Sequence, residues 1–177
     1  MTEDELFQKL LLKAGAYTAK AEHSPMEVEN KLYAWGGEDL SPKMVSKIIL
    51  RLKSENYIDE KRYAGKYTRD KVRLLHKGPK MIRRELFEKG IRDKEIIREA
   101  LDEISEEEWM DALHSYLSPK LRSYTSKARD ERDLSSRLYR AAYARGFEDG
   151  QIRTFLKEHF AHADIDETED LESDDWD

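Results

Sequence analysis

The sequence predicts an all-α fold made of three tandem three-helix modules in an elongated, curved arrangement. Two observations lead to this prediction. Apolar residues recur at spacings of three and four, which is typical of amphipathic helices, and no stretch alternates as a strand would. A pattern of apolar residues also recurs at offsets of 54 and 52 residues, which is typical of a repeat protein.

The repeat has two parts. The first is a trio at relative positions 0, 4 and 5, found as Val28, Leu32 and Tyr33, as Ile82, Leu86 and Phe87, and as Leu134, Leu138 and Tyr139. The second is a set after a glycine, found as Val45, Ile48, Ile49 and Leu52, as Ile97, Ala100, Leu101 and Ile104, and as Ile152, Phe155 and Leu156. One such module buries little surface alone, so we expect the modules to stack. Apolar helical stripes usually pack, so a core is favoured over a ligand pocket for the trios.

Prolines and glycines place the helix ends. Ser-Pro at 24–25 and 41–42, and Gly-Pro at 78–79, each predict a helix start, because proline suits the first helical position. Gly36 and Gly90 predict helix ends, because glycine adopts the left-handed conformation that closes a helix.

The resulting modules are residues 1–56, 57–104 and 105–160, followed by an acidic segment at 161–177. Pro119 interrupts the helical pattern of the third module, and we expect a kink or a break there. The acidic segment holds nine acids and no base, which predicts disorder. A merely solvating tail is favoured over a tether that competes with nucleic acid for the basic regions.

Composition limits the class of protein. The 177 residues are 40% charged and 38% hydrophobic, with a mean hydropathy of −0.88. No apolar run exceeds four residues, whereas a membrane-spanning helix needs about 20. Cysteine is absent, which excludes disulfides and thiolate chemistry. We therefore expect a cytoplasmic protein.

The net charge of −6 hides a basic middle. Residues 61–98 hold 14 basic and five acidic groups, and residues 120–145 hold eight basic and three acidic groups. On the helix expected at 59–77, five cations fall within an arc of roughly 80°. They are Arg62, Lys66, Arg69, Arg73 and Lys77, and Lys80, Arg83 and Arg84 extend the positive region.

This basic stripe predicts a surface for phosphates or for an acidic protein groove. Only Asp70 lies nearby on the same helix, so the charge is expected to be uncompensated. The alternative is a solvated basic face without a partner. The other side of the helix is expected to pack through Tyr63, Ala64, Tyr67, Leu74 and Leu75.

The sequence lacks the motifs that are typical of phosphate-binding and catalytic sites. The sequence contains no glycine-rich phosphate loop and no nucleophile elbow. The five histidines form no ligand set. We therefore expect no catalytic residue, no metal site, no cofactor and no small-molecule substrate, and an enzyme is the least favoured class.

Several segments resemble the RecX family, bacterial recombination regulators that act on RecA. The resemblance is carried by His23-Ser24 through Leu32, by residues 57–64, by Lys77-Gly78-Pro79 through Ile91, and by residues 144–147. The motif positions expected to serve the structure are Ser24, Val28, Leu32, Ile58, Asp59, Tyr63, Ala64, Gly78, Pro79, Ile82, Leu86, Gly90, Ile91 and Gly146.

The resemblance implies tandem three-helix repeats that bind the RecA filament on single-stranded DNA. It implies inhibition of filament extension and of RecA activities, in DNA repair, recombination and the SOS response, without catalysis or a cofactor. The basic stripe fits such a partner, because the filament presents phosphates and acidic groove residues.

Two alternatives unrelated to RecA stay open. A helix-turn-helix DNA-binding protein is disfavoured, because the third helix of the second module presents Glu95, Glu99, Asp102 and Glu103, which repel phosphates. A helical adaptor that binds another protein is compatible with the pattern.

Overall fold

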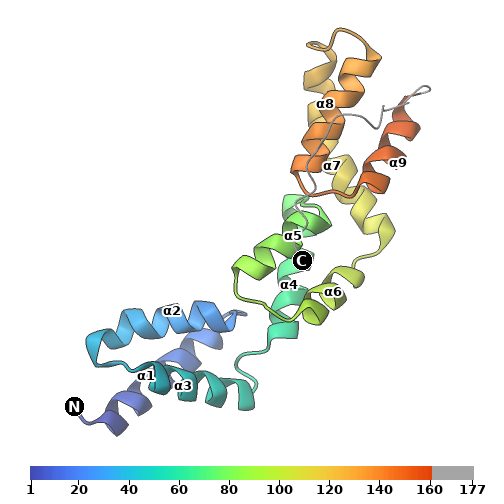
Figure 1. Cartoon of the computed structure of the whole chain (residues 1–177). Helices are drawn as coiled ribbons and strands as arrows, with labels where there is room; N and C mark the ends of the chain where they lie inside the picture. The colour runs from blue at the N-terminus through green and yellow to red at the C-terminus, as the bar shows by residue number, and fades with distance from the viewer. Residues whose placement is uncertain (161–177) are drawn as a thin grey trace.

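The computed structural model describes residues 1–160, where it confirms the all-α class (Figure 1). The described residues hold no strand and form α1 (Glu3–Thr18), α2 (Pro25–Gly36), the short 3₁₀ helix η1 (Gly37–Asp39), α3 (Pro42–Ser54), α4 (Glu60–Leu75), α5 (Pro79–Glu88), α6 (Lys94–Asp102), α7 (Glu106–Thr125), α8 (Glu131–Ala144) and α9 (Asp149–His159). The predicted acidic tail lies outside the described residues. None of these helices combines the length and apolar character needed to cross a membrane.

The predicted helix starts are confirmed. The Ser24 hydroxyl accepts a hydrogen bond from the Glu27 amide (3.2 Å), and the Glu27 carboxylate accepts one from the Ser24 amide (3.1 Å). The Ser41 hydroxyl caps α3 in the same way, and Pro79 opens α5 behind Gly78. The serine hydroxyls accept hydrogen bonds from amides of the first helical turn, which have no partner within the helix, and proline has no amide hydrogen that needs a partner.

The predicted helix ends are confirmed with one shift. Gly90 follows α5 with φ of +90°, in the left-handed region. Gly36 instead has φ of −90° and is the last residue of α2, while Gly37 takes φ of +59°. The predicted end of α2 at Gly36 is confirmed, but the positive φ falls on Gly37, because two consecutive glycines let the helix reach Gly36 before the chain reverses.

The helix α7 continues through Pro119, so a break at this position was a wrong prediction. Proline cannot donate to the carbonyl four residues earlier, which belongs to the exposed Ser115. The Ser118 hydroxyl donates to the His114 carbonyl (2.6 Å). Packing of α7 against both α8 and α9 holds the helix together across this point.

The helices pack in three consecutive groups: α1–α3, α4–α6 and α7–α9. We call them the first, second and third helix groups. Within each group, every helix contacts the other two, and α4 also packs against α7. The buried side chains form two clusters, one within the first group and one that runs through the second and third. Figure 1 shows the groups following one another along an elongated, bent body.

The third residue of each apolar trio is not a core residue. Tyr33 and Phe87 are 38% and 49% exposed, and Tyr139 is half-buried with its hydroxyl on Asp149 (2.7 Å). The first two residues of every trio are buried, as predicted. Positions 0 and 4 share a helix face, whereas position 5 is rotated from position 4 by about 100°.

Two glycines join the second and third helix groups. The Gly78 amide donates to the Arg145 carbonyl (3.0 Å), and the Lys80 amide donates to the Gly146 carbonyl (2.9 Å). A Cβ on Gly78 would lie 2.2 Å from the Gly146 carbonyl carbon, and Gly146 itself has φ of +93°. The two backbones therefore meet at a distance that only glycine permits.

Candidate partner-binding surface on α4 and α5

The helix α4 carries four of the five cations of the basic stripe, since it ends at Leu75, two residues before Lys77, and Asp59 precedes its first residue. The Asp59 carboxylate accepts a hydrogen bond from the Arg62 amide (2.9 Å) and so caps the helix. Tyr63 and Ala64 are buried, as predicted. Leu74 is 72% exposed, and its predicted packing was wrong, because α4 turns its Val72 side inward at this end.

Each cation of the predicted stripe has a carboxylate partner, so the prediction of uncompensated charge was wrong. The pairs are Arg62–Glu22 (2.5 Å), Lys66–Asp70 (2.6 Å), Arg69–Glu103 (3.1 Å), Arg73–Glu108 (2.7 Å) and Lys77–Glu85. Three of these acids, Glu22, Glu103 and Glu108, lie 34 to 40 residues away along the chain. Only the fold brings them to α4, and no local pattern in the sequence marks them as partners.

Four of the five cations nevertheless lie at the surface. The side chains of Arg62, Lys66, Arg69 and Arg73 are between 40% and 58% exposed. Exposed ion pairs contribute little to stability, because water screens both charges and the side chains lose entropy. A phosphate or a partner carboxylate can therefore replace the intramolecular acid at these positions.

Lys77 differs, because its side chain is only 16% exposed. Its ammonium group bonds the Glu85 carboxylate, which also accepts from the Tyr67 hydroxyl (2.9 Å). Burial alone would raise the pKa of Glu85, but the hydrogen bonds from Lys77 and Tyr67 outweigh it and hold that pKa below the ordinary value. Burial, followed by the bond to Glu85, raises the pKa of Tyr67. This geometry assigns Lys77 to the α4–α5 packing.

The helix α5 extends the positive surface. Lys80 lies 3.7 Å from Glu148 and over the Tyr143 ring, with 5.0 Å from its ammonium nitrogen to the ring centre. Arg84 pairs loosely with Glu88 (3.9 Å). Arg83 is exposed and has no ion pair within residues 1–160. Arg83 and Arg84 are thus the cations of this surface that are least held by the rest of the chain.

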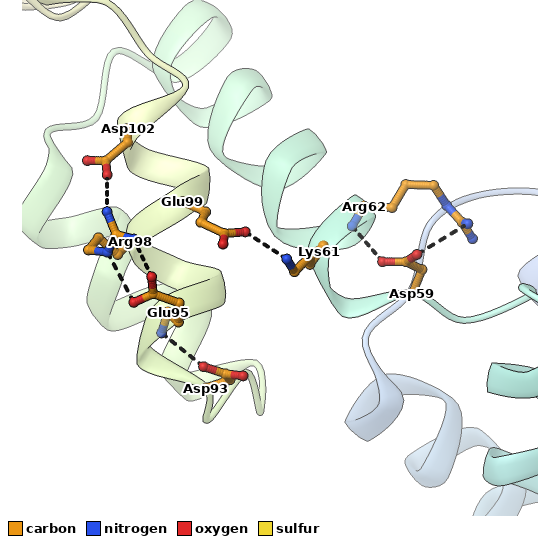
Figure 2. Close-up of polar contacts among 8 residues, drawn as sticks. All are labelled: Asp59, Lys61, Arg62, Asp93, Glu95, Arg98, Glu99 and Asp102. Carbon is orange, nitrogen blue, oxygen red and sulfur yellow. Dashed lines mark hydrogen bonds and ion pairs between the residues drawn. The ribbon is translucent and has the colours of Figure 1, made fainter.

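The outer side of α6 is acidic and is partly neutralised. Figure 2 shows Arg98 between Glu95 and Asp102, and Lys61 of α4 reaching Glu99 (2.9 Å). The hydrogen bond from Arg98 is the main reason that the pKa of Glu95 lies below its ordinary value. An acidic face of this kind repels the phosphates that flank a major groove, so it does not favour the helix-turn-helix alternative.

The first and second helix groups meet through polar contacts that the sequence pattern did not reveal. Besides capping α2, Glu27 accepts from the Tyr63 hydroxyl (3.3 Å) and lies 3.6 Å from the Lys89 ammonium nitrogen. Burial raises the pKa of Tyr63, and the charge of Glu27 and its hydrogen bond to the hydroxyl raise that pKa further. Met26 supplies an apolar contact, since a Cβ on Gly90 would lie 2.8 Å from the Met26 Cβ.

The motif positions predicted to serve the structure lie in the core, at caps and at reversals of the chain. The buried ones are Ser24, Val28, Leu32, Ile58, Tyr63, Ala64, Pro79, Ile82, Leu86 and Ile91. Asp59 caps α4, and the three glycines take the positions described above. These positions have structural roles, so we take the candidate surface to be the exposed cations.

Comparisons with known proteins relate this chain to one family. The model of the second three-helix domain of RecX matches residues 59–101, which hold α4 and α5 and nearly all of α6. The regulatory protein RecX of Oceanobacillus iheyensis is 30% identical over 135 residues, 76% of this chain and 46% of that protein. RecX of Bacillus cytotoxicus is 30% identical over 144 residues, 80% of this chain and 52% of that protein. The chain spans about half the length of these curated relatives.

A solved structure extends the similarity to the fold. The crystal structure of RecX from Lactobacillus salivarius superposes with a TM-score of 0.76 at 27% sequence identity. The match covers 88% of this chain and 97% of that chain. The arrangement of helices described above is therefore shared with a RecX protein.

Proposed function

The chain belongs to the RecX family, and on that basis we propose that it binds the filament that RecA forms on single-stranded DNA. The binding restrains extension of the filament and lowers the activities of RecA. The chain acts as a regulator of recombination and DNA repair in the cytoplasm, where RecA works.

The observation that carries the proposal is the row of exposed cations on α4 and α5, within the segment that matches the RecX domain. A nucleoprotein filament presents both phosphates and protein carboxylates, and each can replace the weakly held intramolecular acids. The predicted contact residues Arg62, Lys66, Arg69 and Arg73 and the α5 residues Lys80, Arg83 and Arg84 form this surface. Lys77 is left out because its side chain is only 16% exposed and is bound to Glu85.

Binding alone suffices for the effect. A chain bound in the groove or at the end of a polymer blocks the next subunit, and it lowers hydrolysis by reducing the number of active subunits. We propose that the protein acts in this way, without chemistry of its own and without a cofactor.

The test is hydrolysis of ATP by RecA of the same organism on single-stranded DNA, titrated with this protein well below stoichiometry. We expect hydrolysis to fall at these low ratios and the effect to weaken with added salt, because exposed charge contacts are screened. No change up to an excess of folded protein would contradict the proposal and would favour an adaptor for another partner.

A matched pair of variants tests the surface. The triple change Lys66→Gln, Arg83→Gln and Arg84→Gln removes three exposed cations from α4 and α5. The control changes Lys9, Lys43 and Lys47 of the first helix group to Gln, which alters the net charge equally. We expect the first variant to need a several-fold higher concentration for inhibition and the control to act like the wild type. Equal inhibition by both would show that these cations make no contact.

A further inference from the structure

The third helix group carries basic residues whose charges, unlike those of the second group, are mostly unpaired. Of the 14 basic residues in 61–98, ten form ion pairs within 4.0 Å. In residues 120–145, the three acids all lie at the start of α8, where Asp133 pairs with Arg129 and Arg137. Lys120, Arg122, Lys127, Arg140 and Arg145 have no carboxylate partner in the described part of the chain.

One of these cations stands between two aromatic rings on α7. The Lys120 ammonium nitrogen lies 5.1 Å from the centre of the Tyr116 ring and 5.8 Å from that of Tyr124. The spacing of four residues on each side places the three side chains in a row along one helix face. All three side chains are half-buried, and both tyrosines also pack against the buried core.

Arg145 extends the row toward the second helix group. Its guanidinium carbon lies 5.1 Å from the centre of the Tyr116 ring, and its nitrogens bond the carbonyls of Leu75 and His76 at the end of α4. Tyr116 in turn lies against the buried Phe147, with 6.4 Å between ring centres. The Tyr116 end of the row is therefore fixed by the core, whereas Tyr124 is the second-last residue of α7.

Supported aromatic rings that alternate with unpaired cations suit a single-stranded nucleic acid. Its bases are free to stack on the rings while its phosphates meet the cations. In a duplex the base faces are already stacked on one another, and an acidic protein would engage the cations without the rings. We propose that Tyr116, Lys120 and Tyr124 form a contact row for single-stranded DNA. This inference rests on the proposed function, since it names the surface that meets the strand within the filament.

The test measures binding of the whole chain to a fluorescein-labelled oligodeoxythymidylate of about 20 nucleotides, without RecA, by fluorescence anisotropy. Tyr124→Leu should weaken binding about tenfold, because one stacked base is lost. Lys120→Gln should weaken it several-fold and lower the salt slope by about one. The controls Tyr57→Leu and Lys47→Gln, at exposed positions of the first helix group and the segment after it, should bind like the wild type.

Three results would overturn the contact row. The variants could bind as tightly as the controls, the wild type could bind an abasic strand of the same length equally well, or it could prefer a duplex. Should Tyr124→Leu lose its helical circular dichroism, Lys120→Gln still decides, because its side chain lies outside the core clusters. RecA inhibition by a chain that does not bind the free strand would refute the row alone, whereas absence of both effects would refute the proposed function as well.

Discussion

Replacing Gly78 by alanine should destabilise the junction between the second and third helix groups. In Gly78→Ala the new Cβ would lie 2.2 Å from the Gly146 carbonyl carbon and from the Phe147 amide nitrogen. Gly78 has φ of −82°, which alanine adopts without strain. The substitution therefore tests chiefly the close approach of the two backbones.

The loss in the free energy of unfolding follows from the contacts that the new methyl group breaks. Restoring van der Waals separation moves the two backbones apart by roughly 1 Å or more. This breaks the bonds from the Gly78 amide to Arg145 (3.0 Å) and from the Lys80 amide to Gly146 (2.9 Å). Two hydrogen bonds at about 0.5–1.5 kcal/mol each, with about 1–3 kcal/mol for overpacking, give a loss of about 2–6 kcal/mol.

The assay is urea unfolding followed by far-ultraviolet circular dichroism. We expect the transition of Gly78→Ala to begin at a lower urea concentration, because the α4–α9 core loses its junction. The control is Gly150→Ala in α9, where a Cβ meets nothing within 4 Å. It should stabilise the protein by about 0.5–1 kcal/mol, because alanine favours a helix. Coincident transitions for the Gly78 variant and the wild type would refute the close approach.

Two further predictions concern α5. Leu86→Ala should cost about 2–5 kcal/mol, because the side chain is fully buried, whereas the exposed Phe87→Ala should stay within about 0.5 kcal/mol; equal shifts in thermal unfolding would contradict the assignment of Leu86 to the core. The folded-state pKa of Glu85 lies below its ordinary value of 4.5, so its stabilising contribution is present above that value and lost as the pH falls through the folded-state pKa. Glu85→Gln should therefore flatten this acid limb of the urea midpoint against pH, and an unchanged limb would show that the bond to Lys77 contributes nothing.

The helices could be predicted because their causes are local. Ser24 and Ser41 cap the helices that follow them, and Pro79 opens α5, by contacts within three residues. The first two positions of every trio are buried because apolar residues one turn apart share a face. The same reasoning failed at the third position, where Phe87 is large and apolar but lies on the solvent side of α5.

The candidate site could be predicted only by residue type. Exposed cations on α4 follow from their spacing, but their partners do not, since Glu22, Glu103 and Glu108 come from outside the helix. The sequence holds 38 acids, and nothing local distinguishes these three from the rest. The pairing of the half-buried Lys77 could not be predicted for the same reason, because its partner Glu85 lies on the next helix.

The sequence by itself determined the helical class, the helix starts at the Ser-Pro and Gly-Pro pairs, and where positive charge gathers, because capping, periodicity and charge act within a few residues. The tertiary structure alone decided which charges are neutralised, that the second and third helix groups share a core, and that Gly78 meets Gly146. These outcomes depend on contacts between residues far apart in the chain, and such contacts exist only after the helices have packed.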